Sequence, residues 1–114
     1  MSSLKLLSRQ WIVNENNNII MGEGRKEIFE NIEITGSLNK TAKIMKMSYK
    51  GVWGKVKATE KSLNVRLVDT DRAQGSKLTR EGKELLRKYR LLKQECLKAD
   101  DEVFREIFEK SNGF

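Results

Sequence analysis

Lysine side chains in the middle of the chain carry the strongest chemical signal in the sequence. No acidic residue lies between Glu33 and Glu60, and the same stretch contains Lys40, Lys43, Lys46, Lys50, Lys55 and Lys57. Ordinary soluble helices intersperse Glu with Lys, because pairs of opposite charge four residues apart stabilise them. A solvated lysine-rich face is one interpretation. A surface that binds a polyanion is the interpretation that the missing acids favour.

The net charge of +7 comes entirely from this middle third of the chain. Residues 1–36 carry four basic and five acidic side chains, residues 37–80 carry eleven and three, and residues 81–114 carry eight of each. The three sums are therefore −1, +8 and 0. A polyanionic partner would meet the residues between 37 and 80.

Several other chemistries are excluded by what the chain lacks. With no His and one Cys in 114 residues, the usual zinc sites, Ser-His and Cys-His catalytic pairs and an internal disulfide are ruled out. No apolar run approaches the ~20 residues of a membrane span, and Lys5 and Arg9 interrupt the Leu-rich N-terminal segment. We therefore expect a cytoplasmic chain that is not an enzyme, with no cofactor, no metal and no membrane partner.

Turn and cap residues divide a single domain, residues 1–114, into four parts. A β-hairpin is predicted within residues 1–24, with strands at 4–13 and 19–21 around an Asn-rich turn at 14–18. Three helices follow within residues 25–63. The first covers 25–34, the second has Asn39 as its N-cap and buries Ala42, Ile44 and Met45, and the third extends from Ser48 to Leu63. Residues 64–79 form a second hairpin with strands at 65–68 and 77–79, and Thr79 caps a long helix over 80–110.

The third predicted helix has two distinct faces on a helical wheel. Val52, Val56 and Leu63 form the stripe expected to be buried, with Tyr49 and Trp53 beside it. We expect Trp53 to pack against the core rather than to stack on a base, whereas Tyr49 fits either role equally.

The opposite face of this helix carries a row at spacing i, i+4, i+7 and i+11, formed by Lys50, Gly54, Lys57 and Lys61. Gly costs about 1 kcal/mol of helix propensity relative to Ala, so Gly54 indicates the close approach of another molecule. A helix that enters the major groove of DNA requires such a face.

Three segments carry a family resemblance. They are Gly36-Ser37-Leu38-Asn39-Lys40-Thr41-Ala42-Lys43, Met47-Ser48-Tyr49-Lys50-Gly51-Val52-Trp53 and Leu78-Thr79-Arg80-Glu81-Gly82. Together with Gly22-Glu23-Gly24-Arg25 they resemble the ModE family of bacterial and archaeal molybdate-dependent transcriptional regulators, over nearly the whole chain. The resemblance implies an α+β, mainly α, fold: a LysR-like winged helix-turn-helix with an N-terminal β-hairpin and a long C-terminal dimerisation helix.

The resemblance also implies contacts to double-stranded DNA. The third helix would place Ser48, Tyr49 and Lys50 at the DNA. The preceding helix would place Lys40 and Thr41 near the backbone, and the second hairpin, as the wing, would carry Arg72 and Lys77. With the lysine face, the predicted DNA-binding residues are Lys40, Thr41, Ser48, Tyr49, Lys50, Gly54, Lys57, Lys61, Arg72 and Lys77.

The sequence departs from the family pattern at three places. Lys46 occupies the turn position that often holds Gly, and the wing has only Gly75 together with Asp69 and Asp71. The chain ends soon after the fourth helix, so we expect no molybdate-binding domain and do not carry over oxyanion sensing.

The fourth helix carries an apolar seam with spacings of 4, 3, 4, 3 and 4, formed by Leu85, Tyr89, Leu92, Cys96, Ala99 and Val103. Such a/d spacing is typical of paired helices. The alternative is that the seam packs on its own domain. A helix of about 30 residues spans roughly 45 Å, which is longer than one small domain covers, so a homodimer is favoured.

These observations predict a sequence-specific DNA-binding transcriptional regulator that acts as a homodimer, with helix 48–63 in the major groove. A winged-helix protein-interaction module and a non-specific nucleic-acid-binding protein are the alternatives. The acid-free stretch disfavours the first alternative, because a protein interface rarely needs so uniform a charge. The second would show no preference among DNA sequences.

Overall fold

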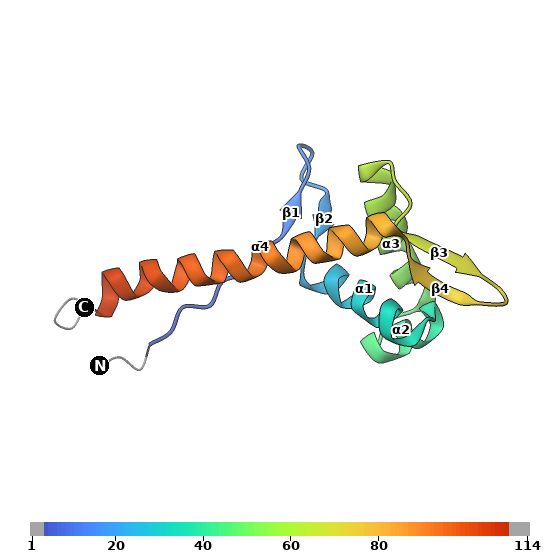
Figure 1. The fold of residues 1–114 in the computed structure, drawn as a ribbon, viewed down its shortest axis with the longest axis horizontal. Coiled ribbons are helices and arrows are strands. Elements are labelled where there is room, and N and C mark those ends of the chain that lie inside the picture. Colours follow the sequence, from blue (N-terminus) through green and yellow to red (C-terminus); the bar gives the residue numbers. More distant parts are fainter. Residues whose placement is uncertain (1–3, 110–114) are drawn as a thin grey trace.

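The computed structural model describes residues 4–109, and its elements follow the predicted order (Figure 1). They are β1 (Ile12–Val13), β2 (Ile19–Met21), α1 (Glu23–Thr35), α2 (Leu38–Met45), α3 (Tyr49–Leu63), β3 (Val68–Asp71), β4 (Gly75–Leu78), α4 (Arg80–Phe104) and the π-helical segment η1 (Arg105–Glu109). The order of hairpin, three helices, hairpin and long helix confirms the predicted fold class. Residues 1–3 and 110–114, at the ends of the predicted domain and long helix, lie outside the described residues.

Side-chain caps explain where three of the helices begin. Ser37, Ser48 and Thr79 each accept a hydrogen bond from the backbone N–H three residues later, at 2.9–3.1 Å. The predicted caps at Ser48 and Thr79 are confirmed. The predicted cap at Asn39 is wrong, because Ser37 already caps α2 and Asn39 lies exposed within its first turn.

The turn between α2 and α3 contains a lysine in a left-handed conformation. Lys46 has φ of 55°, and the backbone N–H of Met47 donates to the carbonyl of Ala42 at 2.9 Å. A side chain in this conformation costs on the order of 1 kcal/mol relative to Gly. The bend of the helix-turn-helix is therefore made without glycine.

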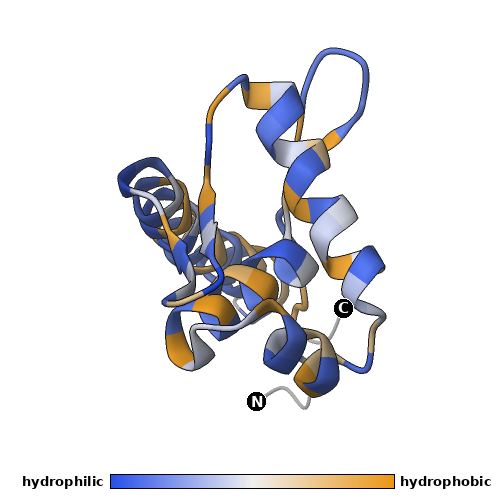
Figure 2. Cartoon of the chain, turned by 90° about the vertical axis from the view of Figure 1, so that its right-hand side faces the viewer, coloured by the Kyte–Doolittle hydropathy of each residue, from blue (hydrophilic) through white to orange (hydrophobic). Residues whose placement is uncertain are grey.

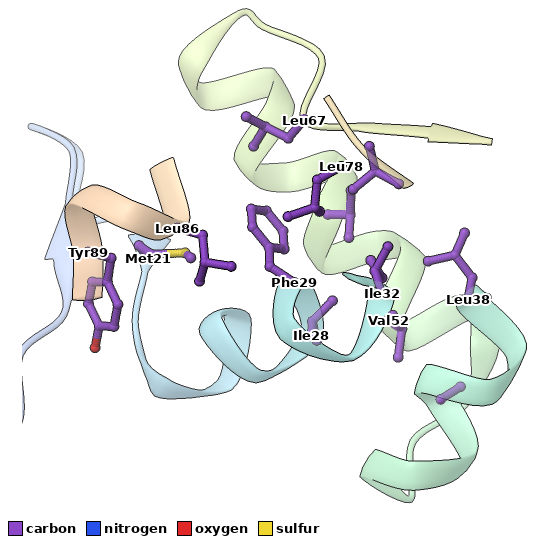
Figure 3. Close-up of a cluster of buried hydrophobic side chains, with 13 residues drawn as sticks. Met21, Ile28, Phe29, Ile32, Leu38, Val52, Leu67, Leu78, Leu86 and Tyr89 are labelled. Carbon is purple, nitrogen blue, oxygen red and sulfur yellow. The ribbon is translucent and has the colours of Figure 1, made fainter. Parts of the chain in front are cut away.

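A core shared by the helices and the wing holds the fold together (Figure 3). It consists of Met21, Ile28, Phe29, Ile32, Leu38, Ala42, Val52, Val56, Leu67, Val68, Leu78, Leu86 and Tyr89. Figure 2 shows hydrophobic and hydrophilic residues alternating along the helices, as expected for amphipathic helices around one core. On α1 the buried face consists of Ile28, Phe29 and Ile32.

Two residues predicted to be buried are largely exposed. Leu63 is 40% and Ile44 is 56% exposed. Thr59 and Glu60 are buried on α3 instead, because their side chains bond backbone groups of other elements. On α2 the buried positions are Leu38, Thr41 and Ala42.

The N-terminal hairpin is shorter than predicted. β1 pairs antiparallel with β2 through an irregular register, and only Ile12–Val13 of the predicted 4–13 strand is a strand. Residues 4–11 do not form a strand and run beside α4 (Figure 1), where the Ser8 hydroxyl donates to an Asp100 carboxylate oxygen at 2.8 Å. A strand requires a neighbouring strand for its backbone hydrogen bonds, and α4 offers none.

The wing strands also differ from the prediction, because the turn is tighter. β3 and β4 pair from Val68 opposite Leu78 to Asp71 opposite Gly75, so the connection covers only residues 72–74. Gly75 has φ of +85°, and a Cβ there would lie 2.4 Å from the carbonyl oxygen of Gly36. The N–H of Ser76 donates to the same oxygen at 2.9 Å, which anchors the wing to the junction of α1 and α2.

The long helix α4 extends well beyond the core (Figure 1). The molecule measures 62 × 30 × 22 Å, and the 25 residues of α4 account for about 37 Å. Among residues 4–109, no helix combines the length and apolar character needed to cross a membrane.

Candidate nucleic-acid interface

The outer row of α3 lies on an open surface. Lys50, Gly54 and Lys61 are exposed, and a Cβ added at Gly54 would meet no atom within 4 Å. Lys61 lies eleven positions after Lys50, which corresponds to a rise of about 16 Å along the helix. The row is therefore long enough to cross a major groove, which is about 12 Å wide.

Lys57, the remaining member of this row, is also engaged within the fold. Its ammonium lies 3.1 Å from a carboxylate oxygen of Glu60 and 4.6 Å from the centre of the Trp53 ring. The side chain of Lys57 remains 49% exposed. Lys57 thus has a structural role that its position on the helical wheel does not show. Trp53 is partly buried against the core, which confirms its predicted packing role.

A buried carboxylate joins α3 to the wing. Glu60 accepts hydrogen bonds from the backbone N–H groups of Leu67 at 2.7 Å and Val68 at 3.1 Å. Burial acts to raise the pKa of Glu60, but the two N–H groups and Lys57 outweigh it, so the pKa is lowered. Glu60 is therefore ionised at neutral pH and fixes the wing relative to α3. This role of Glu60 was not predicted from the sequence, although Glu60 is the acid that ends the acid-free stretch.

The first turn of α3 and the wing share a groove of about 420 Å³. Tyr49, which is 46% exposed, lines this groove together with Arg72 of the wing turn. Ser37 and Asn39 from the start of α2 line it as well and were not predicted as site residues. Only the folded chain brings these three segments together.

The two residues predicted on α2 have different surroundings. Lys40 is exposed and is available to a phosphate. Thr41 is completely buried, with its hydroxyl 3.4 Å from the hydroxyl of Thr35. The prediction that Thr41 lies near the DNA backbone is therefore wrong, because its side chain faces the core.

The strands and turn of the wing, residues 68–78, present two exposed cations, Arg72 in the turn and Lys77 on β4. Its acids are engaged in local contacts. Asp71 accepts hydrogen bonds from two N–H groups of the turn at 2.7 and 3.2 Å. Asp69 lies opposite Lys77 in the register and pairs with Arg66 at 3.0 Å. The wing can therefore present positive charge despite its two acids.

The predicted dimer seam on α4 is divided by the structure. Tyr89 is 1% exposed, and its hydroxyl lies 2.5 Å from the carbonyl oxygen of Gln10 and 3.1 Å from a carboxylate oxygen of Glu23. Burial and the nearby Glu23 raise the pKa of Tyr89 to about 12. Tyr89 therefore belongs to the core of its own domain, and its predicted place in a dimer interface is wrong.

The remaining seam residues become more open toward the C-terminal end. Leu85 and Cys96 are partly buried, whereas Leu92 is 40% exposed, Ala99 is exposed and Val103 is 57% exposed. The part of α4 that extends beyond the core thus keeps an uncovered apolar stripe.

Three helices with a basic outer face on the third, followed by a two-stranded wing, define a winged helix-turn-helix protein. Residues 25–83 match the family described as bacterial regulatory helix-turn-helix proteins, lysR family. This match covers just over half of the chain, which therefore belongs to that family. Its winged helix-turn-helix is accordingly a DNA-binding regulatory domain.

A curated relative agrees with the resemblance to ModE. The chain is 29% identical over 97 residues to the molybdenum transport protein ModE of Azotobacter vinelandii. The aligned region covers 82% of this chain and 36% of that protein. The chain thus spans about a third of the length of this relative.

Solved structures confirm the predicted fold. The DNA-binding domain of CbnR in complex with DNA matches with a TM-score of 0.58 and 21% identity, over 70% of this chain and 91% of that one. CbnR itself, a LysR family transcriptional regulator, matches with a TM-score of 0.57 and 21% identity, over 72% of this chain and 28% of that one.

Proposed function

We propose that this chain binds double-stranded DNA with sequence preference, as a homodimer in the cytoplasm, and regulates transcription with α3 in the major groove. The observation that carries the proposal is the open row on α3, in which Lys50 and Lys61 flank an unobstructed Gly54. The solved complex of the CbnR DNA-binding domain with DNA supports the same use of the fold. The proposal needs no catalytic activity, metal or cofactor.

Affinity and selectivity come from different parts of this surface. Exposed cations such as Lys40, Lys50 and Lys61 neutralise phosphates and release counterions, which gives affinity without sequence information. Ser48, the N-cap of α3, and Tyr49, its first residue, are exposed and lie where recognition helices meet base edges.

Dimerisation uses the free part of α4. Leu92, Ala99 and Val103 are separated by seven and four residues and remain exposed, as expected for positions that face a second helix. Pairing of this stripe with its copy about a two-fold axis would bury it. Two recognition helices would then address half-sites about one DNA turn, ~34 Å, apart.

The first experiment selects bound fragments from the source genome and measures affinity for the best one across a salt series. An inverted repeat preferred by at least ~10³-fold over scrambled DNA is the expected result. If about five phosphates are neutralised per subunit, the slope of log K against log salt is near −9 for the dimer. Equal binding to all sequences would contradict sequence specificity, and no binding at ~0.15 M salt would contradict the proposal itself.

Charge reversal tests the row on α3 directly. Lys50→Glu with Lys61→Glu should abolish specific binding and leave the circular dichroism spectrum unchanged, because both side chains are exposed. Lys57 is left intact because it bonds Glu60. The matched control is Lys98→Glu with Arg105→Glu, which makes the same change in net charge at two exposed positions, one on α4 and one at the start of η1. Equal affinities of the two double variants would refute the role of the row.

A further inference from the structure

The N-terminal hairpin is fixed to the C-terminal half of α3 by a network of hydrogen bonds. The Thr59 hydroxyl donates to the carbonyl of Ile20 at 3.1 Å. The Arg25 guanidinium donates to the Thr59 oxygen at 2.9 Å and to the carbonyl of Ile19. Figure 1 shows the hairpin and the end of α3 projecting to the same side of α4. The hairpin is therefore held in one position beside the candidate recognition helix.

The tip of this hairpin is ordered by the Asn14 side chain together with backbone hydrogen bonds. The side-chain oxygen Oδ1 of Asn14 accepts hydrogen bonds from the backbone N–H groups of Asn16 at 2.9 Å and Asn18 at 3.0 Å. The backbone N–H of Asn17 donates to the backbone carbonyl of Asn14 at 2.9 Å, and Asn17 has φ of 64°. The tip thus has a defined shape, and the side chains of residues 16–18 are exposed on it.

An open groove of about 650 Å³ separates the tip from the end of α3. Its polar lining residues are Asn14, Asn17, Asn18, Arg25, Lys61 and Ser62. Amides, a hydroxyl and two cations dominate this lining, and it contains no carboxylate. The one acid of the tip, Glu15, does not line the groove. Such a set of donors suits a ligand that offers oxygen acceptors and negative charge.

Arg25 contributes a charge that the fold does not neutralise. Its partners among the described residues are a carbonyl and a hydroxyl, neither of which is charged. An arginine remains protonated even when partly buried. The groove is therefore positive from both the α1 side and the α3 side, where Lys61 lies.

The position of the groove identifies its ligand. Lys61 is both the last member of the row on α3 and part of the groove lining. Because the row is about 16 Å long and the major groove about 12 Å wide, a helix that contacts one strand near Lys50 reaches the opposite strand near Lys61. We propose that the hairpin groove binds the sugar-phosphate backbone of that opposite strand. This inference rests on the proposed function, and it makes the hairpin a second DNA-contacting element besides the wing.

Two substitutions test the two sides of the groove. Lys61→Gln should lower the magnitude of the salt slope by about 0.9 per subunit, because one phosphate is no longer neutralised. Asn18→Asp places a negative charge in the groove without altering the backbone bonds of the tip, and should weaken operator binding about fivefold per subunit. Gln94→Glu is the matched control, because it makes the same change at an exposed position of α4 and should bind as the wild type.

A modified operator shows whether the effect acts through the backbone. Operators that carry a single neutral methylphosphonate are scanned across the site, and one flanking position should weaken the wild-type protein but leave Asn18→Asp almost unaffected. If Asn18→Asp and Lys61→Gln both bind as tightly as the wild type, the hairpin groove does not contact DNA while the proposed function stands. The same conclusion follows if no methylphosphonate position affects these variants differently from the wild type. If the wild-type protein binds no DNA, the proposed function and this inference both fail.

Discussion

Replacing Glu60 tests the central connection between the recognition helix and the wing. The side chain of Glu60 is 8% exposed and accepts hydrogen bonds from the N–H groups of Leu67 and Val68, with Lys57 at 3.1 Å. Glu60→Ala removes the acceptor and leaves two buried donors without a partner. Each such donor costs about 1–3 kcal/mol, so we expect the free energy of unfolding to fall by about 2–4 kcal/mol, allowing for some access of water.

The effect of Glu60 has a defined pH dependence. Its pKa is lowered in the folded protein from the ordinary value of 4.5, so its ionised form stabilises the fold. This contribution is fully present above about pH 4.5 and is lost as the pH falls through the lower folded pKa. The difference in stability between the wild type and Glu60→Ala should therefore shrink on acidification below pH 4.5. Glu60→Gln, which retains an oxygen acceptor, should lose only about 1 kcal/mol at neutral pH.

Urea unfolding followed by circular dichroism measures these differences, at one fixed protein concentration because dimer dissociation contributes to the transition. Glu33→Ala, at an exposed position of α1, serves as the control and should stay within ±0.5 kcal/mol of the wild type. If Glu60→Ala also stays within that range, Glu60 does not hold the wing and the reasoning is wrong.

Four further substitutions test the packing of single residues. Gly82→Ala should destabilise the protein by about 2 kcal/mol in urea, since its Cβ would lie 2.2 Å from the Leu67 carbonyl oxygen. Gly54→Ala, in open space, should instead stabilise α3 by about 1 kcal/mol and weaken operator binding. If Gly82→Ala and Gly54→Ala change the stability equally, the difference in packing between the two glycines is contradicted. Val103→Asp should shift sedimentation from dimer to monomer, whereas an unchanged dimer would exclude this stripe. Tyr89→Phe should lower the free energy of unfolding by about 1–2 kcal/mol below pH 10. This difference from the wild type should shrink between pH 10 and about 12 as the wild-type hydroxyl ionises, because the hydroxyl, whose pKa is raised in the folded protein, stabilises the fold only while it is neutral. A difference that is constant with pH would rule this out.

Much of the fold follows from local signals in the sequence. The caps at Ser48 and Thr79 and the helix stop at Gly36 depend on neighbours only a few residues away. The same applies to the row from Lys50 to Lys61, because helical spacing alone places these residues on one face. Element order, fold class and the basic face of α3 were therefore accessible from the sequence.

Long-range packing explains the predictions that were wrong. Tyr89 fits a heptad seam by its spacing, but it is buried because Gln10 and Glu23, more than 60 residues away, close over it. Thr41 was expected at the DNA surface but is buried, and Leu63 was expected to be buried but is exposed. Burial depends on which elements pack against a helix face, and the sequence of the helix does not show which elements these are.

The sequence determined the elements of this protein and the sign of the charge on α3, since both depend on interactions between close neighbours along the chain. The tertiary structure determined which of those charges are available. It pairs Lys57 with a buried carboxylate, joins Tyr49 to Arg72 across one groove and places the Asn-rich tip beside Lys61. Each of these outcomes depends on the docking of one element against another, and helical or strand periodicity carries no information about that docking.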